Sequence, residues 1–348
     1  MKTCRVVFLL IITIGCYVSL SACGTDADNS GEEKDSKNKK SDSGADSDSD
    51  ADADADTDAA LPPDGGQDAS GDSEDDYDFG VDYVSHAPII IDGNDDFHAQ
   101  AANEEWGGDG SEENPYIIEG YEIDLQEGPG GAVDVRNTDL YFVIRHCYLH
   151  GGGGAWFDDS KRGYGILTEN VQNMRVERTM AKENFEGVRM TKGTTDSVLH
   201  YNDFAMNSGH GIALASAHNN IIEYNKCINE HDDGILLGSF DMAAAGDPSN
   251  NNIIRFNWFA NNSSSGICLF RGKGNFIYGN AFGAGCGVFV LNTGGVNTWY
   301  SEEERTGNWW YNFSAPDEDG DGVYDTPRTV AGGAEDRYPL VEKPDTTP

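Results

Sequence analysis

A glycine followed by an apolar strand pattern recurs six times between residues 165 and 290. In most of these fragments the first and third residues after the glycine are apolar while the second varies, which is typical of a strand with one buried face. Successive glycines are separated by 22, 24, 23, 32 and 21 residues. The six fragments start at Gly165, Gly187, Gly211, Gly234, Gly266 and Gly287. Self-similarity at this period predicts a solenoid of stacked coils.

A second fragment, which ends in asparagine, keeps step with the first. It occupies residues 197–202, 220–225, 252–257 and 275–280. Two or three short strands per turn, with glycine and asparagine at the corners, indicate an all-β fold: a single-stranded parallel β-helix with 22 to 24 residues in a regular coil. Equivalent residues then stack about 4.7–4.9 Å apart. We therefore expect an internal ladder of amide hydrogen bonds along Asn202, Asn225, Asn257 and Asn280.

The hydrophobic and polar pattern divides the chain into five segments. They are an export signal (1–22), an acidic tether (23–80), an N-terminal cap with the first coil (81–130), the β-helix repeats (131–295) and an aromatic C-terminal cap (296–348). A strand is expected at residues 116–118. The open ends of a solenoid need covering, and aromatic side chains are expected to cover them: Phe97 and Trp106 at the first end, and Trp299, Trp309, Trp310 and Tyr311 at the second.

The first 22 residues have the features of a bacterial export signal. Lys2 and Arg5 precede an apolar run over residues 6–18. Leu20-Ser21-Ala22-Cys23 then matches a lipobox, so Cys23 is expected to be acylated and to hold the protein in a membrane. No aspartate follows Cys23, which favours the outer membrane or the cell surface over the inner membrane. The alternative is an ordinary signal peptide with an incidental cysteine.

Charge separates the tether from the rest of the chain. The tether carries 20 acidic and 4 basic residues, which keeps it extended and without a core. The signal contributes +2 and the tether −16, which leaves −24 for the remaining residues out of a net charge of −38. Such an acidic domain argues against nucleic acid as a partner, and an anionic polysaccharide would need bridging cations. The oligomeric state stays open.

Two loops interrupt the period, at residues 151–163 and 240–251. Insertions in solenoids are often found on the binding face. The first loop contains Trp156, Asp158 and Asp159, which we predict to bind a ligand together with Arg189.

Four cysteines follow the signal and the lipobox, and the repeat register argues against disulfides. Cys147 and Cys227 are placed in one inward column with Met180, Phe204 and Phe259, but several coils apart. Cys268 and Cys286 lie in adjacent coils at different lateral positions. We predict free structural thiols and no copper site among them.

With these residues described, the chain resembles the NosD-like right-handed parallel β-helix proteins over about residues 89–340. The resemblance rests on Asn114-Pro-Tyr-Ile-Ile-Glu-Gly-Tyr-Glu-Ile123, on the coil fragments above, and on a closing stretch from Gly307 to Leu340. Relatives of this kind include copper-binding, sugar-hydrolase-like and carbohydrate-binding proteins. The resemblance therefore implies the fold more firmly than one function. The lipobox and the tether suggest an anchored envelope protein.

An aspartate-rich loop between residues 317 and 325 is the sharpest metal signal. Asp317, Asp319, Asp321 and Asp325 stand at positions 1, 3, 5 and 9, with glycine at position 6, which is the spacing of a partial calcium loop. Arg328 replaces the usual glutamate at position 12, so Asp336 or Glu335 would have to complete the site. The alternative is an acidic turn without an ion.

Stacking also brings together one candidate acid–base column. The residues before successive coil glycines include Glu186, His210 and Asp233, which are expected to be vertical neighbours. Carboxylate, imidazole and carboxylate are the groups used in general acid–base catalysis, and the acids would raise the imidazole pKa. The alternative is three polar residues at solvent-exposed corners.

Two functions follow from these features. The first is an envelope lipoprotein that displays a rigid β-helix to polysaccharides. The second is a polysaccharide-active enzyme, a lyase, epimerase or hydrolase, that uses the column. Copper handling rests on the resemblance alone.

Overall fold

The computed structural model describes residues 79–154, 158–238, 248–292 and 295–346. The chain divides into two units, Met1–Gln67 and Asp68–Pro348, and all described residues belong to the second. The export signal, Cys23 and almost all of the tether lie outside the described residues. Trp156 and most of the loop at 240–251 also lie outside them. Within the described residues, no helix has the length and apolarity needed to span a membrane.

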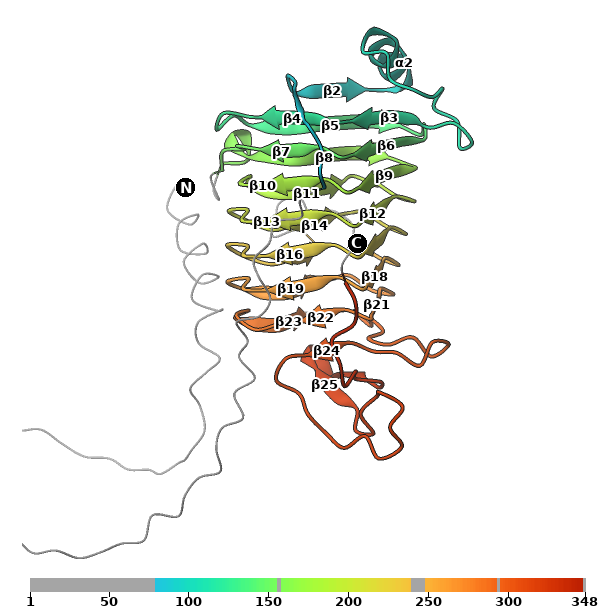
Figure 1. Cartoon of the computed structure of the whole chain (residues 1–348), viewed down its shortest axis with the longest axis vertical. Helices are drawn as coiled ribbons and strands as arrows, with labels where there is room; N and C mark the ends of the chain where they lie inside the picture. Colours follow the sequence, from blue (N-terminus) through green and yellow to red (C-terminus); the bar gives the residue numbers. More distant parts are fainter. Residues whose placement is uncertain (1–78, 155–157, 239–247, 293–294, 347–348) are drawn as a thin grey trace, which may run out of the picture. The chain divides into compact units, whose positions relative to one another are not determined.

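Three parallel sheets form the walls of the solenoid (Figure 1). Sheet A contains β1 (Val84–Ser85), β4 (Tyr121–Asp124), β7 (Tyr148–His150), β10 (Met180–Lys182), β13 (Asp203–Ala205), β16 (Lys226–Ile228), β19 (Trp258–Ala260), β22 (Ala281–Phe282) and β24 (Trp309–Trp310). Sheet B contains β2 (Ile89–Asp92), β5 (Gly130–Thr138), β8 (Gly163–Val171), β11 (Glu186–Thr191), β14 (Ile212–Ala215), β17 (Ile235–Leu237), β20 (Ser265–Leu269) and β23 (Val288–Asn292). Sheet C contains β3 (Tyr116–Glu119), β6 (Phe142–Arg145), β9 (Met174–Glu177), β12 (Val198–His200), β15 (Ile221–Glu223), β18 (Ile253–Arg255) and β21 (Phe276–Tyr278).

Each coil passes through sheets B, C and A in turn. In the three-residue strands the middle side chain points inward, as Leu199, Ile222 and Ile254 do on neighbouring rungs of sheet C. All three are fully buried. The parallel β-helix that the sequence predicts is confirmed, with three strands per coil.

The predicted asparagine ladder is present at the corner between sheets C and A. The side-chain amide of Asn202 donates to Asn225 at 2.9 Å, Asn225 donates to Asn257 at 3.0 Å, and Asn257 donates to Asn280 at 3.0 Å. Each carboxamide oxygen also accepts the backbone N–H of the asparagine one coil earlier. The ladder continues beyond the prediction to Asn308. Two parallel columns at the other corners include Asn220, Asn252 and Asn275, and Asn184, Asn207, Glu230 and Asn262.

Two predicted register positions are wrong. Met180 pairs with Asp203 and points outward. Ala181, the smallest residue of this strand, pairs with Phe204 and takes the inward position. Cys147 stands one residue before β7, level with Thr179 and the asparagine ladder, where its thiol donates to the Arg145 carbonyl at 3.3 Å. Cys147 and Cys227 therefore do not share a column.

In the last coil the position of the glycine also differs from the predicted register. The coil step stays at 23 residues, with Phe259 paired to Phe282 and Ile267 to Val290. The glycine step of 21 residues does not follow it, so Gly287 is two positions away from the place equivalent to Gly266. A shift of two preserves side-chain alternation, which is why the sequence pattern conceals it. Cys286 therefore does not stack on Ser265.

All four predicted thiols are free. Burial raises the pKa of Cys147 to about 11 and raises the pKa of Cys227 and Cys286 as well. High thiol pKa values make these side chains poor nucleophiles and poor metal ligands.

Both ends of the solenoid are covered. At the N-terminal end α2 (Asn94–Asn103), which the sequence pattern did not predict, lies over the first coil (Figure 1). It places the buried Phe97 ring 5.2 Å from that of Tyr116. At the other end Trp310 stacks on Phe282 at 4.3 Å, and Trp299 is fully buried. Trp309 is only partly buried and Tyr311 is exposed, so two of the four aromatic residues form the plug.

The remaining elements belong to the C-terminal cap and to one loop. They are β25 (Arg328–Val330), β26 (Ala334–Asp336) and the 3₁₀ turns η1 (Asp159–Lys161) and η2 (Ala331–Gly333). The guanidinium of Arg328 lies 4.3 Å from the centroid of the Trp310 ring.

Candidate functional site

Glu186, His210 and Asp233 are brought to one corner, as predicted. Glu186 opens β11, and His210 and Asp233 precede β14 and β17 at equivalent register. Nδ1 of His210 lies 3.4 Å from a carboxylate oxygen of Asp233 and 3.8 Å from one of Asp232. The three predicted residues are only 1–2% exposed. The corner is therefore a buried polar cluster, and the solvent-exposed alternative is wrong.

The protonation of this cluster differs from the expectation. Burial, followed by the positive charges of Arg189 and Arg162, lowers the pKa of His210 to about 3. Burial, followed by the charge of Asp232, raises the pKa of Asp233 to about 7. We expected the acids to raise the imidazole pKa, but desolvation of the imidazolium outweighs their attraction. His210 is thus a neutral base at neutral pH.

The loop at 151–163 folds onto the same corner. The backbone N–H of Gly152 donates to the Asn184 side chain at 3.0 Å. A Cβ on Gly154 would lie 2.6 Å from the Phe185 ring, so glycine permits this close approach. The Arg162 guanidinium stands 4.6 Å from the centroid of that ring. The sequence analysis treated the loop and the column as separate features, and the structure places them side by side.

The structure describes the contacts of two of the predicted ligand-binding residues, Arg189 and Asp158. Arg189 donates to both oxygens of Glu186, at 2.8 and 3.1 Å, which places its guanidinium beside the column. Asp158 is paired with Lys161 at 3.2 Å and accepts from Ser160. The Asp159 side chain and Trp156 lie outside the described part, so their predicted role stays a prediction.

The aspartate-rich loop lies between β24 and β25. Ligand oxygens of Asp317, Asp319 and Asp321 fall within 4.8 Å of one another. Asp325 instead accepts the backbone N–H of Glu318 at 2.8 Å. Asp336 cannot complete the site, because it is fully buried and binds the backbone and side chain of Asn308. All-oxygen ligands in a turn of this spacing fit a hard cation such as calcium, with three carboxylates in place of the predicted four.

The outer face of sheet C is a feature that the sequence analysis missed. Its outward side chains form two files along the coils. One is mainly apolar and partly buried: Ile117, Val143, Arg175, Val198, Ile221, Ile253 and Phe276. The other is polar: Glu119, Arg145, Glu177, His200, Glu223, Arg255 and Tyr278. Outward alternation at two positions of every sheet C fragment was the sequence signal for both files.

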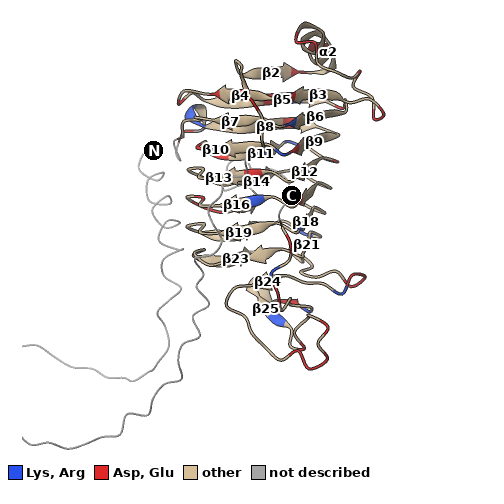
Figure 2. Ribbon diagram, viewed as in Figure 1, with Lys and Arg blue, Asp and Glu red and all other residues tan. Residues whose placement is uncertain are grey.

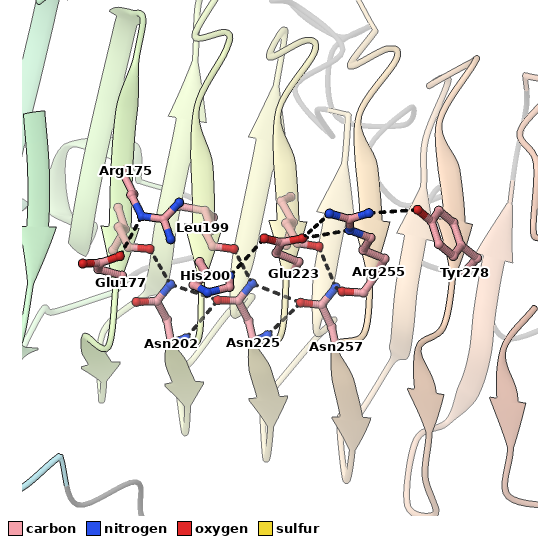
Figure 3. Close-up of polar contacts among 12 residues, drawn as sticks. Arg175, Glu177, Leu199, His200, Asn202, Glu223, Asn225, Arg255, Asn257 and Tyr278 are labelled. Atoms are coloured by element: carbon pink, nitrogen blue, oxygen red, sulfur yellow. Dashed lines mark hydrogen bonds and ion pairs between the residues drawn. The ribbon is translucent and has the colours of Figure 1, made fainter. Parts of the chain in front are cut away.

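Side chains of the polar file form hydrogen bonds and ion pairs with one another (Figure 3). Arg255 lies between Glu223, at 2.7 Å, and the Tyr278 hydroxyl, at 3.1 Å. Glu223 also approaches His200 at 3.0 Å. Burial, and then the charge of Arg175, lower the pKa of His200. These contacts fix the side chains of the file in position, so that they form an ordered surface.

The outward residues of sheets A and B are buried on several middle coils, whereas those of the first coils, such as Asp124 on sheet A and Ile90 on sheet B, are exposed. On sheet A, Lys182, Asp203 and Lys226 are at most 3% exposed. The C-terminal segment returns along this side, and the Lys343 ammonium lies 3.5 Å from the centroid of the Trp258 ring (Figure 1). On sheet B the outward Ala213, Leu236 and Cys268 are at most 3% exposed. Over the same middle coils, the outward side chains of sheet C from Val198 to Arg255 stay partly exposed.

The fold defines a capped parallel β-helix repeat protein. The chain belongs to the family described as periplasmic copper-binding protein (NosD), whose model matches residues 110–315. This confirms the resemblance found in the sequence. The periplasmic description agrees with the export signal expected at the N-terminus.

Solved structures supply more distant similarities. The periplasmic alginate epimerase AlgG is 15% identical, with a TM-score of 0.40 over 52% of this chain and 45% of that chain. An alginate lyase from Paenibacillus sp. str. FPU-7 is 13% identical, with a TM-score of 0.42 over 58% of this chain and 67% of that chain. The Dettilon tailspike protein is 16% identical, with a TM-score of 0.37 over 65% and 54%. The chain thus spans less than half of the epimerase. No curated protein sequence matches significantly.

Proposed function

We propose that this protein is a glycan-binding module of the cell envelope and that the outer face of sheet C binds a linear polysaccharide. The observation that carries the proposal is the pair of side-chain files on this face, one mainly apolar and one polar, repeated over seven coils. On the middle coils of sheets A and B, outward residues such as Lys226 and Leu236 are at most 3% exposed.

The chemistry of sugars matches two such files. A pyranose ring has an apolar C–H surface and a rim of hydroxyl groups, so it needs apolar contact and hydrogen-bonding groups together. The files provide both at every rung except that of Arg175 and Glu177, and successive rungs are about 4.7–4.9 Å apart. An extended glycan running along the solenoid axis would meet equivalent groups at every coil.

The charge of this face also favours the proposal. The two files contain Glu119, Glu177 and Glu223 against Arg145, Arg175 and Arg255, which balance. Segments with basic and with acidic residues both occur along the solenoid (Figure 2). The face is thus close to neutral in a strongly acidic chain. It does not repel an acidic glycan as the rest of the surface would.

Phe276 and Arg145 offer the test. Phe276 is 49% exposed at one end of the apolar file, and Arg145 stands near the other end of the polar file. The mature chain is titrated against a panel of neutral and acidic linear polysaccharides. Phe276→Ala and Arg145→Ala are each expected to weaken binding about tenfold, which corresponds to about 1.4 kcal/mol. Leu291→Ala, at an exposed outward position of sheet B, is the matched control. No saturable binding, or equal affinity in all variants, would rule out this face.

A polysaccharide-active enzyme finds less support. Glu186, His210 and Asp233 are only 1–2% exposed, and a polymer would need contact with them. Appearance of new reducing ends or unsaturated products from any polysaccharide of the panel would reverse this preference.

The proposal includes a lipid anchor at Cys23, with the acidic tether as a spacer from an outer membrane. Its support is the lipobox and the periplasmic description of the family. Cys23→Ser is expected to abolish acylation and move the protein from the membrane fraction to the soluble fraction. An acylated, membrane-bound variant would contradict the anchor.

A further inference from the structure

A row of aromatic side chains follows the corner between sheets C and A. It consists of Tyr201, Tyr224 and Phe256, each directly after an outward residue of the polar file. The ring centroids of Tyr201 and Tyr224 are 4.7 Å apart, and those of Tyr224 and Phe256 are 5.0 Å apart. All three side chains are partly exposed. This row is called the aromatic column below.

The backbone conformation does not explain why aromatic residues occupy these positions. All three have φ values between 54° and 57°, in the left-handed region that bulky side chains disfavour. At the corner between sheets B and C, the equivalent left-handed positions hold residues that tolerate this conformation: Asn173, Asp196, Asn219, Asn251 and Gly274. The aromatic column therefore keeps three bulky rings where asparagine or glycine would be less strained.

Packing inside the solenoid does not explain the rings either. Each is followed by a fully buried asparagine of the ladder, whereas the ring itself stays partly exposed. The centroid separations are those of offset stacks, so each ring covers part of its neighbour's face and leaves its outer edge exposed. The aromatic column is thus a continuous apolar strip at the surface.

The polar file borders the aromatic column along its length. The ring centroids of His200 and Tyr201 are 4.3 Å apart, and the Arg255 guanidinium lies 5.8 Å from the centroid of the Phe256 ring. An apolar strip beside a row of hydrogen-bonding groups suits a sugar chain, which has apolar C–H surfaces and hydroxyl groups. The inference therefore rests on the glycan-binding function proposed for this face, and it concerns the class of glycan.

The charges beside the aromatic column are already paired. Glu223 accepts from Nε of Arg255 at 2.8 Å and lies 2.7 Å from Nη2 of the same guanidinium. Nη1 of Arg255 donates to the Tyr278 hydroxyl at 3.1 Å (Figure 3). Arg175 is paired with Glu177 at 2.6 Å. A carboxylate or sulfate group on a sugar would have to displace a glutamate from its arginine.

Arg178 is the exception among the neighbouring arginines. It is exposed and occupies the equivalent corner one coil before Tyr201. A single guanidinium at one end of the aromatic column can meet one unit of a polymer, whereas an acidic polysaccharide repeats its charge along its length. This arrangement favours a neutral chain.

The environment of Tyr224 also disfavours an anion. Burial raises the pKa of Tyr224, and the neighbouring Tyr201 raises it as well. The carboxylates of Glu223 and Asp345 raise it further, against the charge of Arg255. The phenol therefore stays protonated at neutral pH and can donate to a sugar oxygen.

We propose that the aromatic column and the adjacent polar file bind a neutral linear polysaccharide that runs parallel to the solenoid axis. The rings contact the C–H surfaces of the sugars. The phenol hydroxyls and the paired glutamates and arginines form hydrogen bonds with the sugar hydroxyl groups. Substitution of a ring in the column should therefore weaken binding of a neutral chain.

Calorimetric titration of the mature chain tests this class of ligand. The neutral probes are mixed-linkage β-glucan, galactomannan and xylan, and the acidic probe is polygalacturonate. We expect the wild type to bind a neutral probe more tightly than the acidic one. Tyr224→Asn should weaken that binding about tenfold, because asparagine suits the left-handed backbone but removes the ring. Tyr224→Phe keeps the ring and should keep most of the affinity.

Met206→Asn is the matched control. Met206 has a φ of 57°, is 44% exposed and lies at the corner between sheets A and B, so the same change is made on the same backbone conformation away from the aromatic column. It should leave the affinity unchanged. The melting temperature of each variant is measured in parallel, because rings that only stabilise the corner would change the melting temperature and not the affinity.

The outcomes separate this inference from the proposed function. Unchanged affinity in Tyr224→Asn, with Phe276→Ala still weakened, would overturn the role of the aromatic column and leave the function of sheet C intact. If Tyr224→Asn does not fold, Tyr201→Asn decides. Equal or tighter binding of polygalacturonate, lost in Arg178→Ala, would overturn the neutral class. Absence of binding to every polysaccharide would remove the proposed function and this inference with it.

Discussion

Asp336 illustrates at the residue scale how a carboxyl group can end a ladder of amides. Its oxygen accepts from the backbone N–H of Asn308 at 2.8 Å and from Nε1 of Trp310 at 2.9 Å. The side chain is fully buried, and burial raises its pKa to about 6 despite these hydrogen bonds. The asparagines above it serve the same acceptor role without a charge.

The raised pKa predicts a pH dependence of folding. The folded state holds the Asp336 proton more tightly than the unfolded chain, whose pKa is near 3.8. Stability from this group is therefore complete below about pH 4 and is lost as pH rises to about 6. The loss is at most about 3 kcal/mol, since one pKa unit corresponds to about 1.4 kcal/mol. Asp336→Asn should remove this slope.

Chemical denaturation at a series of pH values measures the difference between Asp336→Asn and the wild type. Other buried titratable groups, including Glu230, are common to both proteins and cancel in the difference. A difference that stays constant from pH 4 to pH 7 would mean that Asp336 titrates normally.

At the element scale, the C-terminal cap combines an aromatic plug with an acidic loop. Trp299 and Trp310 close the core, and β25 and β26 carry Arg328 over it. The loop ahead of them has its carboxylates turned inward: Asp317 accepts the backbone N–H groups of Gly320 and Gly322. A cap with three carboxylates in one turn is the element most sensitive to a bound cation.

Calcium is predicted to stabilise this cap. An ion that binds only the folded loop stabilises by about 2.7 kcal/mol at a hundredfold excess over its Kd. Calcium should raise the melting temperature, and the double change Asp319→Ala and Asp321→Ala should remove the increase. Magnesium should act weakly, because it requires tighter octahedral geometry. Scanning calorimetry measures all three.

Glu318→Ala is the matched control for the calcium experiment, because Glu318 lies in the same loop but outside the cluster of three. It should keep the calcium effect. A wild-type melting temperature that does not respond to calcium after chelator treatment would reduce the loop to an acidic turn.

At the scale of the whole molecule, stability depends on an unbroken stack of coils. A regular coil contributes one strand to each of the three sheets and one residue to each asparagine column between the sheets. A single coil has no core of its own, so its neighbours supply most of its buried contacts. The loss of one inward residue should therefore affect the entire solenoid.

Ile222→Asp tests this dependence. Ile222 is fully buried between Leu199 and Ile254, and an unpaired carboxylate there would cost several kcal/mol. Cooperative loss of the β-sheet circular dichroism signal at a much lower temperature is expected. Ile221→Asp, one residue earlier and outward on sheet C, should have a small effect. Similar melting of both variants would contradict the register.

The sequence alone determined the period, the inward positions and the asparagine ladder. These features depend on spacing along the chain: a side chain two residues from an inward one is also inward, and equivalent residues one coil apart must stack. For the same reason Glu186, His210 and Asp233 could be placed together before their surroundings were known. The pattern failed where a shift of two residues preserves alternation, at Cys147 and at Gly287, and it was wrong by one residue at Met180, where Ala181 points inward.

Only the tertiary structure decided which surfaces are covered. The C-terminal segment lies against Trp258 on sheet A, and the loop at 151–163 lies against Phe185 beside the column. Both contacts join segments that lie outside the repeat, so the periodicity of the sequence does not predict them. Burial at this corner lowers the pKa of His210 and raises that of Asp233, because a charge loses its hydration there.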